Sequence, residues 1–188
     1  MKSKLFEKLG ILLILLFYNC VQNSGMEYDE EDSSVIINEI NYNSAENFNT
    51  GDWVELYNHS SELIELENFY FMDNDDNHIF YFPDDFIINS GSLVVLCSDT
   101  TQFKSKHPEI NNFLGNLGFS FNGNGEMLRL FNSNNNLIDW VDYGDSDPWP
   151  SGPDGNGPTL ELNDPLSDNS LPENWVSSDG YGSPGEIN

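Results

Sequence analysis

The sequence predicts an all-β sandwich, and three observations support this fold class. From Val35 onward, short runs of β-branched and aromatic residues alternate with clusters of Asn, Asp, Ser and Gly. Several runs alternate polar and apolar residues with a period of two, as side chains do along a strand. After Val35 no convincing long helical pattern interrupts these runs. Regularly spaced short strands without long helices are typical of a two-layer sandwich.

The first two predicted strands are Val35–Asn41 and Asp52–Asn58, joined by a loop rich in Asn, Ser, Thr and Gly. In the second run Trp53, Glu55 and Tyr57 share one face, and the residues between them share the other. This alternation, bounded by turn-forming residues, indicates a pair of β-strands.

Three further runs continue the pattern. Leu63–Phe71 begins with a strand-like alternation, and Asp73–Asn77 (DNDDN) predicts a turn. Ile79–Phe82 is a short aromatic strand that ends before a proline. Leu93–Cys97 is a continuous apolar run and predicts a buried strand. Its cysteine is therefore interpreted as a small core residue and not as a nucleophile.

The next segment, Thr100–Asn112, is interpreted as a loop with at most one helical turn. After it, Met127–Phe131 and Leu137–Tyr143 flank a run of Asn and Ser. These residue types tolerate the left-handed backbone of a tight turn. The two runs are therefore predicted to form a hairpin.

Residues 144–188 are rich in proline and glycine and contain only brief apolar runs. Two fragments, Thr159–Leu162 and Asn174–Val176, could pair as strands. We expect the rest to be extended chain held against the sandwich by large apolar side chains: Trp149, Leu160, Leu162 and Trp175. On this interpretation residues 35–188 form one domain.

An ordered set of segments resembles the lamin tail domain: NEI in the first strand, then WVELYN, FYFMDNDD, SGSLVVLC, LRLFNSNNNLIDWVDY, and the closing WP, GNGPTLEL, NW and SPG. The resemblance runs from Val35 to about Pro184. It implies an immunoglobulin-like β-sandwich of about seven to nine strands with a binding or architectural role. The closing pattern is similar to the version found in bacterial secreted and envelope proteins.

The N-terminus is expected to direct export. Three lysines (Lys2, Lys4, Lys8) precede the apolar run Ile11–Tyr18, which is too short for a membrane-spanning helix of about 20 residues. Residues 1–20 are therefore interpreted as a signal peptide. Cys20 lies at the distance expected for a lipoprotein signal, although the three preceding residues depart from that pattern. Lipidation of Cys20 and ordinary secretion both remain open, and either places the protein in the cell envelope or outside the cell.

Residues 21–34 contain five acids and one aromatic residue, which predicts a disordered acidic linker. The whole chain has 6 basic and 32 acidic residues. Removing residues 1–20 takes away three lysines and one glutamate, which leaves 3 basic and 31 acidic residues. Nucleic-acid affinity depends on Lys and Arg, so no nucleic-acid partner is expected. The acidity is interpreted chiefly as a solvated surface, with attraction to divalent cations as the alternative.

The chain shows no catalytic motif. His59, His78 and His107 lie in separate turns or loops without the spacing of a zinc site, so each is interpreted as a surface histidine. No nucleophile elbow or phosphate-binding loop is present. Close pairs of carboxylates are abundant, and this abundance makes them uninformative. The sequence therefore predicts that the protein is not an enzyme.

One loop has a weak resemblance to a calcium site. Asp73, Asp75 and Asn77 place oxygen ligands at alternate positions, but His78 stands where a helix-flanked calcium loop requires glycine. The preferred interpretation is a solvated turn without a cofactor. Asp145–Asp154 is a second Asp-rich loop of the same kind.

The predicted function is a non-catalytic binding or architectural module that contacts a protein or a cell-surface polymer. The alternative is a carbohydrate-binding module with calcium-stabilised loops, in which an exposed Trp149 or Trp175 stacks on sugar rings. Membrane association is expected only through a lipid on Cys20. The exposure of the two tryptophans separates these functions.

Overall fold

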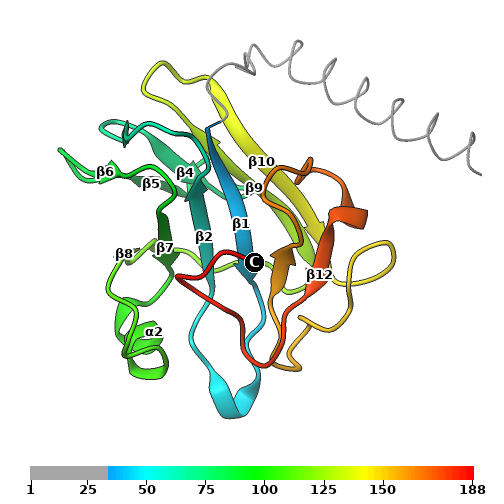
Figure 1. The fold of residues 1–188 in the computed structure, drawn as a ribbon. Coiled ribbons are helices and arrows are strands. Elements are labelled where there is room, and N and C mark those ends of the chain that lie inside the picture. The colour runs from blue at the N-terminus through cyan, green and yellow to red at the C-terminus, as the bar shows by residue number, and fades with distance from the viewer. Residues whose placement is uncertain (1–33) are drawn as a thin grey trace, which may run out of the picture.

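The computed structural model describes residues 34–188, in which two β-sheets pack face to face as a sandwich (Figure 1). The predicted signal peptide, Cys20 and nearly all of the predicted linker lie outside the described residues. The described part contains twelve short strands, one α-helix and two 3₁₀ turns. The all-β, immunoglobulin-like sandwich expected from the sequence is therefore confirmed.

The larger sheet has six strands in the spatial order β12, β11, β1, β2, β7, β8. Neighbours are antiparallel except β7 and β8, which are parallel because helix α2 crosses between them. The bounds of these elements are β1 Val35–Asn41, β2 Trp53–Asn58, β7 Leu93–Cys97, α2 Thr100–Lys106, β8 Phe113–Gly115, β11 Leu160–Leu162 and β12 Trp175–Ser177.

The second sheet has four antiparallel strands in the order β10, β9, β4, β5, and β3 pairs with β6 in a separate two-stranded ribbon. Their bounds are β3 Ile64–Glu65, β4 Tyr70–Met72, β5 Ile79–Tyr81, β6 Ile87–Ile88, β9 Gly125–Phe131 and β10 Leu137–Gly144. The 3₁₀ turns are η1 (Glu46–Phe48) and η2 (Pro172–Asn174).

The main core fills the space between the two sheets. Its fully buried side chains come from alternate positions on both sheets, as the period of two requires: Ile40, Val54, Leu56, Leu96, Phe71, Leu128, Leu130 and Val141. Burial of these apolar side chains stabilises the sandwich by about 25 cal/mol for each Å² removed from water. A smaller cluster of Trp53, Val95, Cys97 and Phe103 lies on the other face of the six-stranded sheet, beneath α2.

Most of the predicted strands are present with bounds within a few residues. The hairpin of β9 and β10 and the pairing of β11 with β12 both match the sequence interpretation. The tail is held as expected, since Leu160 and Leu162 are fully buried. Trp149 and Trp175 pack against each other with ring centroids 6.0 Å apart.

Three details differ from the sequence interpretation. The single run Leu63–Phe71 is divided into β3 and the start of β4 by Asn68, whose φ of 62° turns the chain. The loop Thr100–Asn112 contains a seven-residue helix, not a single turn. Asp99 caps this helix by accepting a hydrogen bond from the Gln102 backbone N–H. The strands β6 and β8 were not predicted, because each is only two or three residues long.

Candidate functional site

The loop between β4 and β5 is shaped by its short polar side chains. The Asp73 carboxylate accepts a hydrogen bond of 2.7 Å from the backbone N–H of Asp75. The Asp75 carboxylate in turn accepts from the backbone N–H and the side-chain amide of Asn77, at 2.9 and 2.7 Å. Such local bonds favour turns over regular structure, which is why the DNDDN run ends β4.

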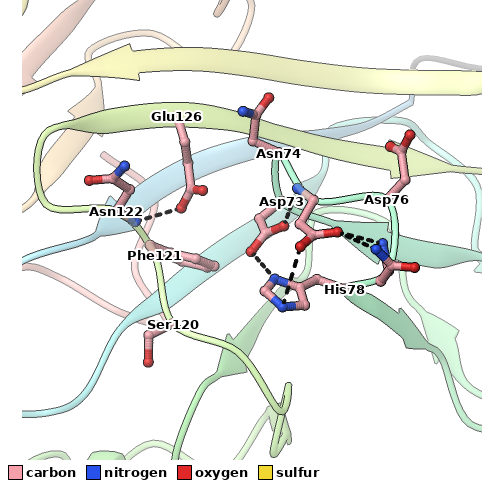
Figure 2. A pocket seen from close by; sticks show the side chains of 10 residues that line it. Asp73, Asn74, Asp76, His78, Ser120, Phe121, Asn122 and Glu126 are labelled. Carbon is pink, nitrogen blue, oxygen red and sulfur yellow. Dashed lines mark hydrogen bonds and ion pairs between the residues drawn. The ribbon is translucent and has the colours of Figure 1, made fainter.

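A pocket of about 610 Å³ lies beside this loop (Figure 2). One wall is the loop from Asp73 to His78. The other wall is formed by Ser120–Asn122 and by Glu126 on β9, which are distant in sequence but face the loop across the sandwich edge. Four carboxylates line this acidic pocket: Asp73, Asp75, Asp76 and Glu126.

Hydrogen bonds fix the charged side chains around the pocket. Asp73, which is 3% exposed, contacts the His78 ring Nδ1 at 2.7 Å, and this bond raises the His78 pKa. The His78 ring also stacks on Phe119 with centroids 5.0 Å apart. Glu126 accepts a 2.6 Å hydrogen bond from the backbone of Asn122, while burial raises the pKa of its carboxyl.

Arg129 neutralises one side of this region. Its guanidinium donates to the backbone carbonyl of Asp73 and lies 3.0 Å from the Asp76 carboxylate. The guanidinium is largely buried, whereas Asp76 is exposed. Arg129 therefore joins β9 to the hairpin loop. Among the described residues, neither Asp75 nor Glu126 forms an ion pair with a lysine or an arginine.

The candidate calcium ligands Asp73, Asp75 and Asn77 all line the acidic pocket. The carboxylates of Asp73 and Asp75 already accept turn bonds, and Asp73 also contacts His78, so a cation at these two residues would have to compete with these partners. Within residues 34–188, no three His, Cys, Asp or Glu side chains are grouped so that they could hold a metal ion. A solvated turn without a cofactor stays the prediction for this loop, with calcium binding as the alternative.

Residues 29–145 match the family model of the Lamin Tail Domain, which covers more than half of the chain. The chain belongs to the lamin tail domain family. It is also similar to the crystal structure of a DUF4876 family protein from Bacteroides thetaiotaomicron, with a TM-score of 0.48 and 12% identity over 78% of this chain and 68% of that one. A search of curated proteins found no match.

The buried tryptophans remove the proposed sugar platform from this lamin tail domain. Trp149 is 9% exposed and Trp175 is 3% exposed, and the Trp175 indole donates a 2.7 Å hydrogen bond to the Asn169 carbonyl. Neither ring has a free face on which a sugar could stack. The expectation that these residues bind carbohydrate is wrong, because the tail uses both rings to fill the core.

One of the three histidines also departs from expectation. His107 is only 6% exposed and packs against Trp53 and Phe103 at the end of α2. Burial lowers its pKa, so the ring favours the neutral form. His59 and His78 are partly exposed, and the three histidines belong to separate clusters.

Cys97 is fully buried, as predicted. Burial raises the pKa of its thiol to about 12, so the nucleophilic thiolate is scarce at neutral pH. Within the described residues, no helix of this lamin tail domain is long and apolar enough to cross a membrane.

Sequence reasoning missed a set of buried carboxylates. Glu39 and Glu55 on the six-stranded sheet are both fully buried, and Asp139 on β10 is 5% exposed. Burial raises their pKa values to about 8, 7 and 7, respectively. In the sequence these residues look like the polar members of alternating runs. Only the packing of the C-terminal segment reveals that they are buried: residues 183–185 cover Glu39 and Glu55, and Asn169 packs on Asp139.

Proposed function

We propose that this lamin tail domain is a non-catalytic binding module of the bacterial cell envelope or the extracellular space, where it contacts a protein or a cell-surface polymer. The acidic pocket beside the β4–β5 loop is the observation that supports a binding role. It is open enough for a side chain or a short polymer unit, and its walls offer polar groups from three parts of the chain.

The chemistry of the pocket favours a partner with cationic or hydrogen-bond-donating groups. Four carboxylates line it, and acids outnumber bases by 31 to 3 in residues 21–188. An acidic surface attracts such groups and repels phosphate backbones. The same charge argues against nucleic acid as a partner.

A site-specific photocrosslinker tests the binding role. Benzoylphenylalanine replaces Asn74 at the rim of the acidic pocket, and in a matched variant it replaces the exposed Glu173 on η2. We expect illumination of native-host cells to produce an adduct with the Asn74 variant and not with the Glu173 variant. Identical adducts, or none with either variant, would contradict binding at this pocket.

The proposed location rests on the apolar run of residues 11–18 and on Cys20. Detergent-phase partitioning of the protein made in its native host, compared with the Cys20→Ala variant, tests it. If Cys20 carries a lipid, only the wild type enters the detergent phase. If the protein is simply secreted, both forms stay in the aqueous phase. Retention of both forms in the cytoplasm would contradict export.

We propose that the domain needs no cofactor. Because the turn bonds already occupy Asp73 and Asp75, millimolar calcium should leave the melting temperature unchanged. The measurement is a thermal melt with calcium and with a matched concentration of magnesium. A rise seen with calcium alone, and lost in Asp75→Asn, would establish a calcium site in this loop.

A further inference from the structure

Three glutamates form a row on the outer face of the six-stranded sheet. Glu161 on β11 and Glu55 on β2 are both directly opposite Glu39 on β1 in the strand register. Glu39 and Glu55 are fully buried, and Glu161 is partly buried. Like charges placed directly opposite one another destabilise a sheet, so this glutamate row requires an explanation.

The C-terminal strap, residues 183–188, passes over β1 and β2 (Figure 1). Its hydrogen bonds place it on the glutamate row. The backbone N–H of Ser183 donates to Glu39 Oε1 at 3.0 Å, and its hydroxyl donates to Glu161 Oε1 at 2.7 Å. Two residues later, the N–H of Gly185 donates to Glu55 Oε2 at 2.5 Å. The strap therefore bonds to all three carboxyl groups.

The strap lies in close contact with these groups. Gly182, just before the strap, has a φ of 88°, and a Cβ added there would lie 2.5 Å from Glu39 Oε1. Only glycine adopts this conformation and leaves room for the carboxyl group. The strap lies beyond the residues 29–145 that match the family model, and it begins with the SPG of the closing pattern.

Within residues 34–188, no basic residue forms an ion pair with the carboxyl groups of the row. Burial, followed by the charge of Glu55, raises the pKa of Glu39 to about 8, and burial raises that of Glu55 to about 7. Burial also raises the Glu161 pKa, with a further contribution from Asp179. The strap's own acid, Glu186, is exposed. All the charges acting on the row from β1, β2, β11 and the segment after β12 are therefore negative.

Two acceptor atoms in this cluster, Glu39 Oε2 and Asn38 Oδ1, are buried without a hydrogen-bond partner. A buried carboxylate oxygen without a partner is costly, typically by about 1–3 kcal/mol or more. A proton on Glu39 removes its charge and turns this oxygen into a donor. The strap N–H groups favour the ionised form, but the raised pKa values show that burial and repulsion outweigh these bonds.

We propose that the C-terminal strap is a proton-controlled closure, seated on the sheet while the Glu39–Glu55 pair holds a proton and released when both groups ionise. Ionisation places two or three negative charges side by side in a site that the strap keeps dry. Release of the strap admits water to them and uncovers the outer face of β11, β1 and β2. The closure does not depend on the partner proposed above.

The direction of the pH effect follows from the raised pKa values. Carboxyl groups whose pKa is higher in the closed state stabilise that state at low pH. This stabilisation is complete below about pH 4.5, the ordinary glutamate value, and is lost as the pH rises through 7 to 8. The strap should therefore be closed in mildly acidic surroundings and open in alkaline ones.

Amide hydrogen exchange of the protein at pH 6.0 and pH 8.5, corrected for the intrinsic exchange rate, tests the closure. We expect the protection factors of the Ser183 and Gly185 amides to fall at least about tenfold at the higher pH, because the pKa values of Glu39 and Glu55 in the closed state lie more than one unit above the ordinary glutamate value. Protection of β2 amides should fall less. In Glu39→Gln the pair can hold only one charge, so the strap should stay protected at both pH values.

Glu65→Gln, which alters an exposed glutamate on β3, is the matched control and should behave like the wild type. Equal strap protection at both pH values, or an unchanged decrease in Glu39→Gln, would overturn the proposal. If Glu39→Gln does not fold, a pH titration of the wild-type protein, followed by carbon-13 NMR of its carboxyl groups, tests the proposal instead. Titration of both Glu39 and Glu55 below pH 5.5 would also overturn the proposal.

Discussion

At the residue scale, Asp139 shows how a buried acid can act as a structural connector. Its carboxylate accepts hydrogen bonds from the backbone N–H of Ile37, at 2.6 Å, and from the side chain of Asn169, at 2.7 Å. Ile37 lies next to the irregular register between β1 and β2, so its N–H is free to point at the opposite sheet. One side chain thus joins β1, β10 and the C-terminal extension.

Replacing Asp139 with alanine should lower the free energy of unfolding by about 2–4 kcal/mol, because it leaves two buried donors unpaired. Urea unfolding followed by tryptophan fluorescence at pH 6 measures this change. The matched control is Asp142→Ala, which alters an exposed residue on the same strand and should cost less than about 1 kcal/mol. Equal losses in the two variants would show that the hydrogen bonds of Asp139 contribute nothing specific.

His78 provides a titration that reports on the acidic pocket. Its hydrogen bond to Asp73 raises its pKa above the ordinary value of 6.5. The stability that this pair contributes is complete below pH 6.5 and is lost as the pH rises through the raised pKa. An NMR titration of the ring protons should show this elevation, and Asp73→Asn should reduce it. A wild-type value at or below 6.5 would contradict the bond.

At the scale of elements, the C-terminal extension is part of the sandwich and not an appendage. β11 adds to the free edge of β1, and β12 adds to β11, so two strands from residues 160–177 complete the six-stranded sheet. Trp149 and Trp175 fill the core beneath them. Helix α2 and the C-terminal strap together cover the outer face of the same sheet.

Trp175→Ala should therefore destabilise the whole domain by about 3–5 kcal/mol, the usual cost of removing a large buried aromatic side chain. The neighbouring Val176→Ala alters a side chain that is 38% exposed and should cost less than about 1 kcal/mol. Chemical denaturation measures both. A Trp175→Ala variant as stable as the wild type would mean that the extension does not belong to the cooperative unit.

At the scale of the whole molecule, acidity and burial act together. The chain carries a formal net charge of −26, and burial raises the pKa of seven acids within residues 34–188. In four of them the pKa rises to about 6 to 8: Asp52, Glu39, Glu55 and Asp139. Each of these groups favours the folded state when it is protonated. Acidification also reduces the mutual repulsion of the surface charges. His107 and Asp75, whose pKa values are lowered, oppose this trend.

The melting temperature should therefore be higher at pH 5.5 than at pH 8.5. Asp52, Glu39, Glu55 and Asp139 stabilise the fold fully below about pH 4, and this stabilisation is lost as the pH rises through about 6 to 8. Scanning calorimetry in buffers of equal ionic strength measures the difference, and Glu39→Gln should reduce it. A melting temperature that is unchanged or higher at pH 8.5 would show that these carboxyl groups titrate normally.

The positions of most strands along the chain, the turns between them and the pairing of β9 with β10 and of β11 with β12 could be predicted from the sequence. Alternating side chains and turn-forming residues are local signals, and they do not depend on distant contacts. The helix after Asp99 and the two-residue strands were harder to predict, because a few residues carry too little periodicity.

The sequence by itself determined the fold class, the family resemblance and the strongly acidic character of the chain, because each is carried by local pattern or composition. Only the tertiary structure decided which acids are buried, because Glu39, Glu55 and Asp139 contact segments more than 100 residues away. It also decided that Trp149 and Trp175 face the core. Burial is a property of what packs on a side chain, and neither face of a strand shows from its own residues what will cover it.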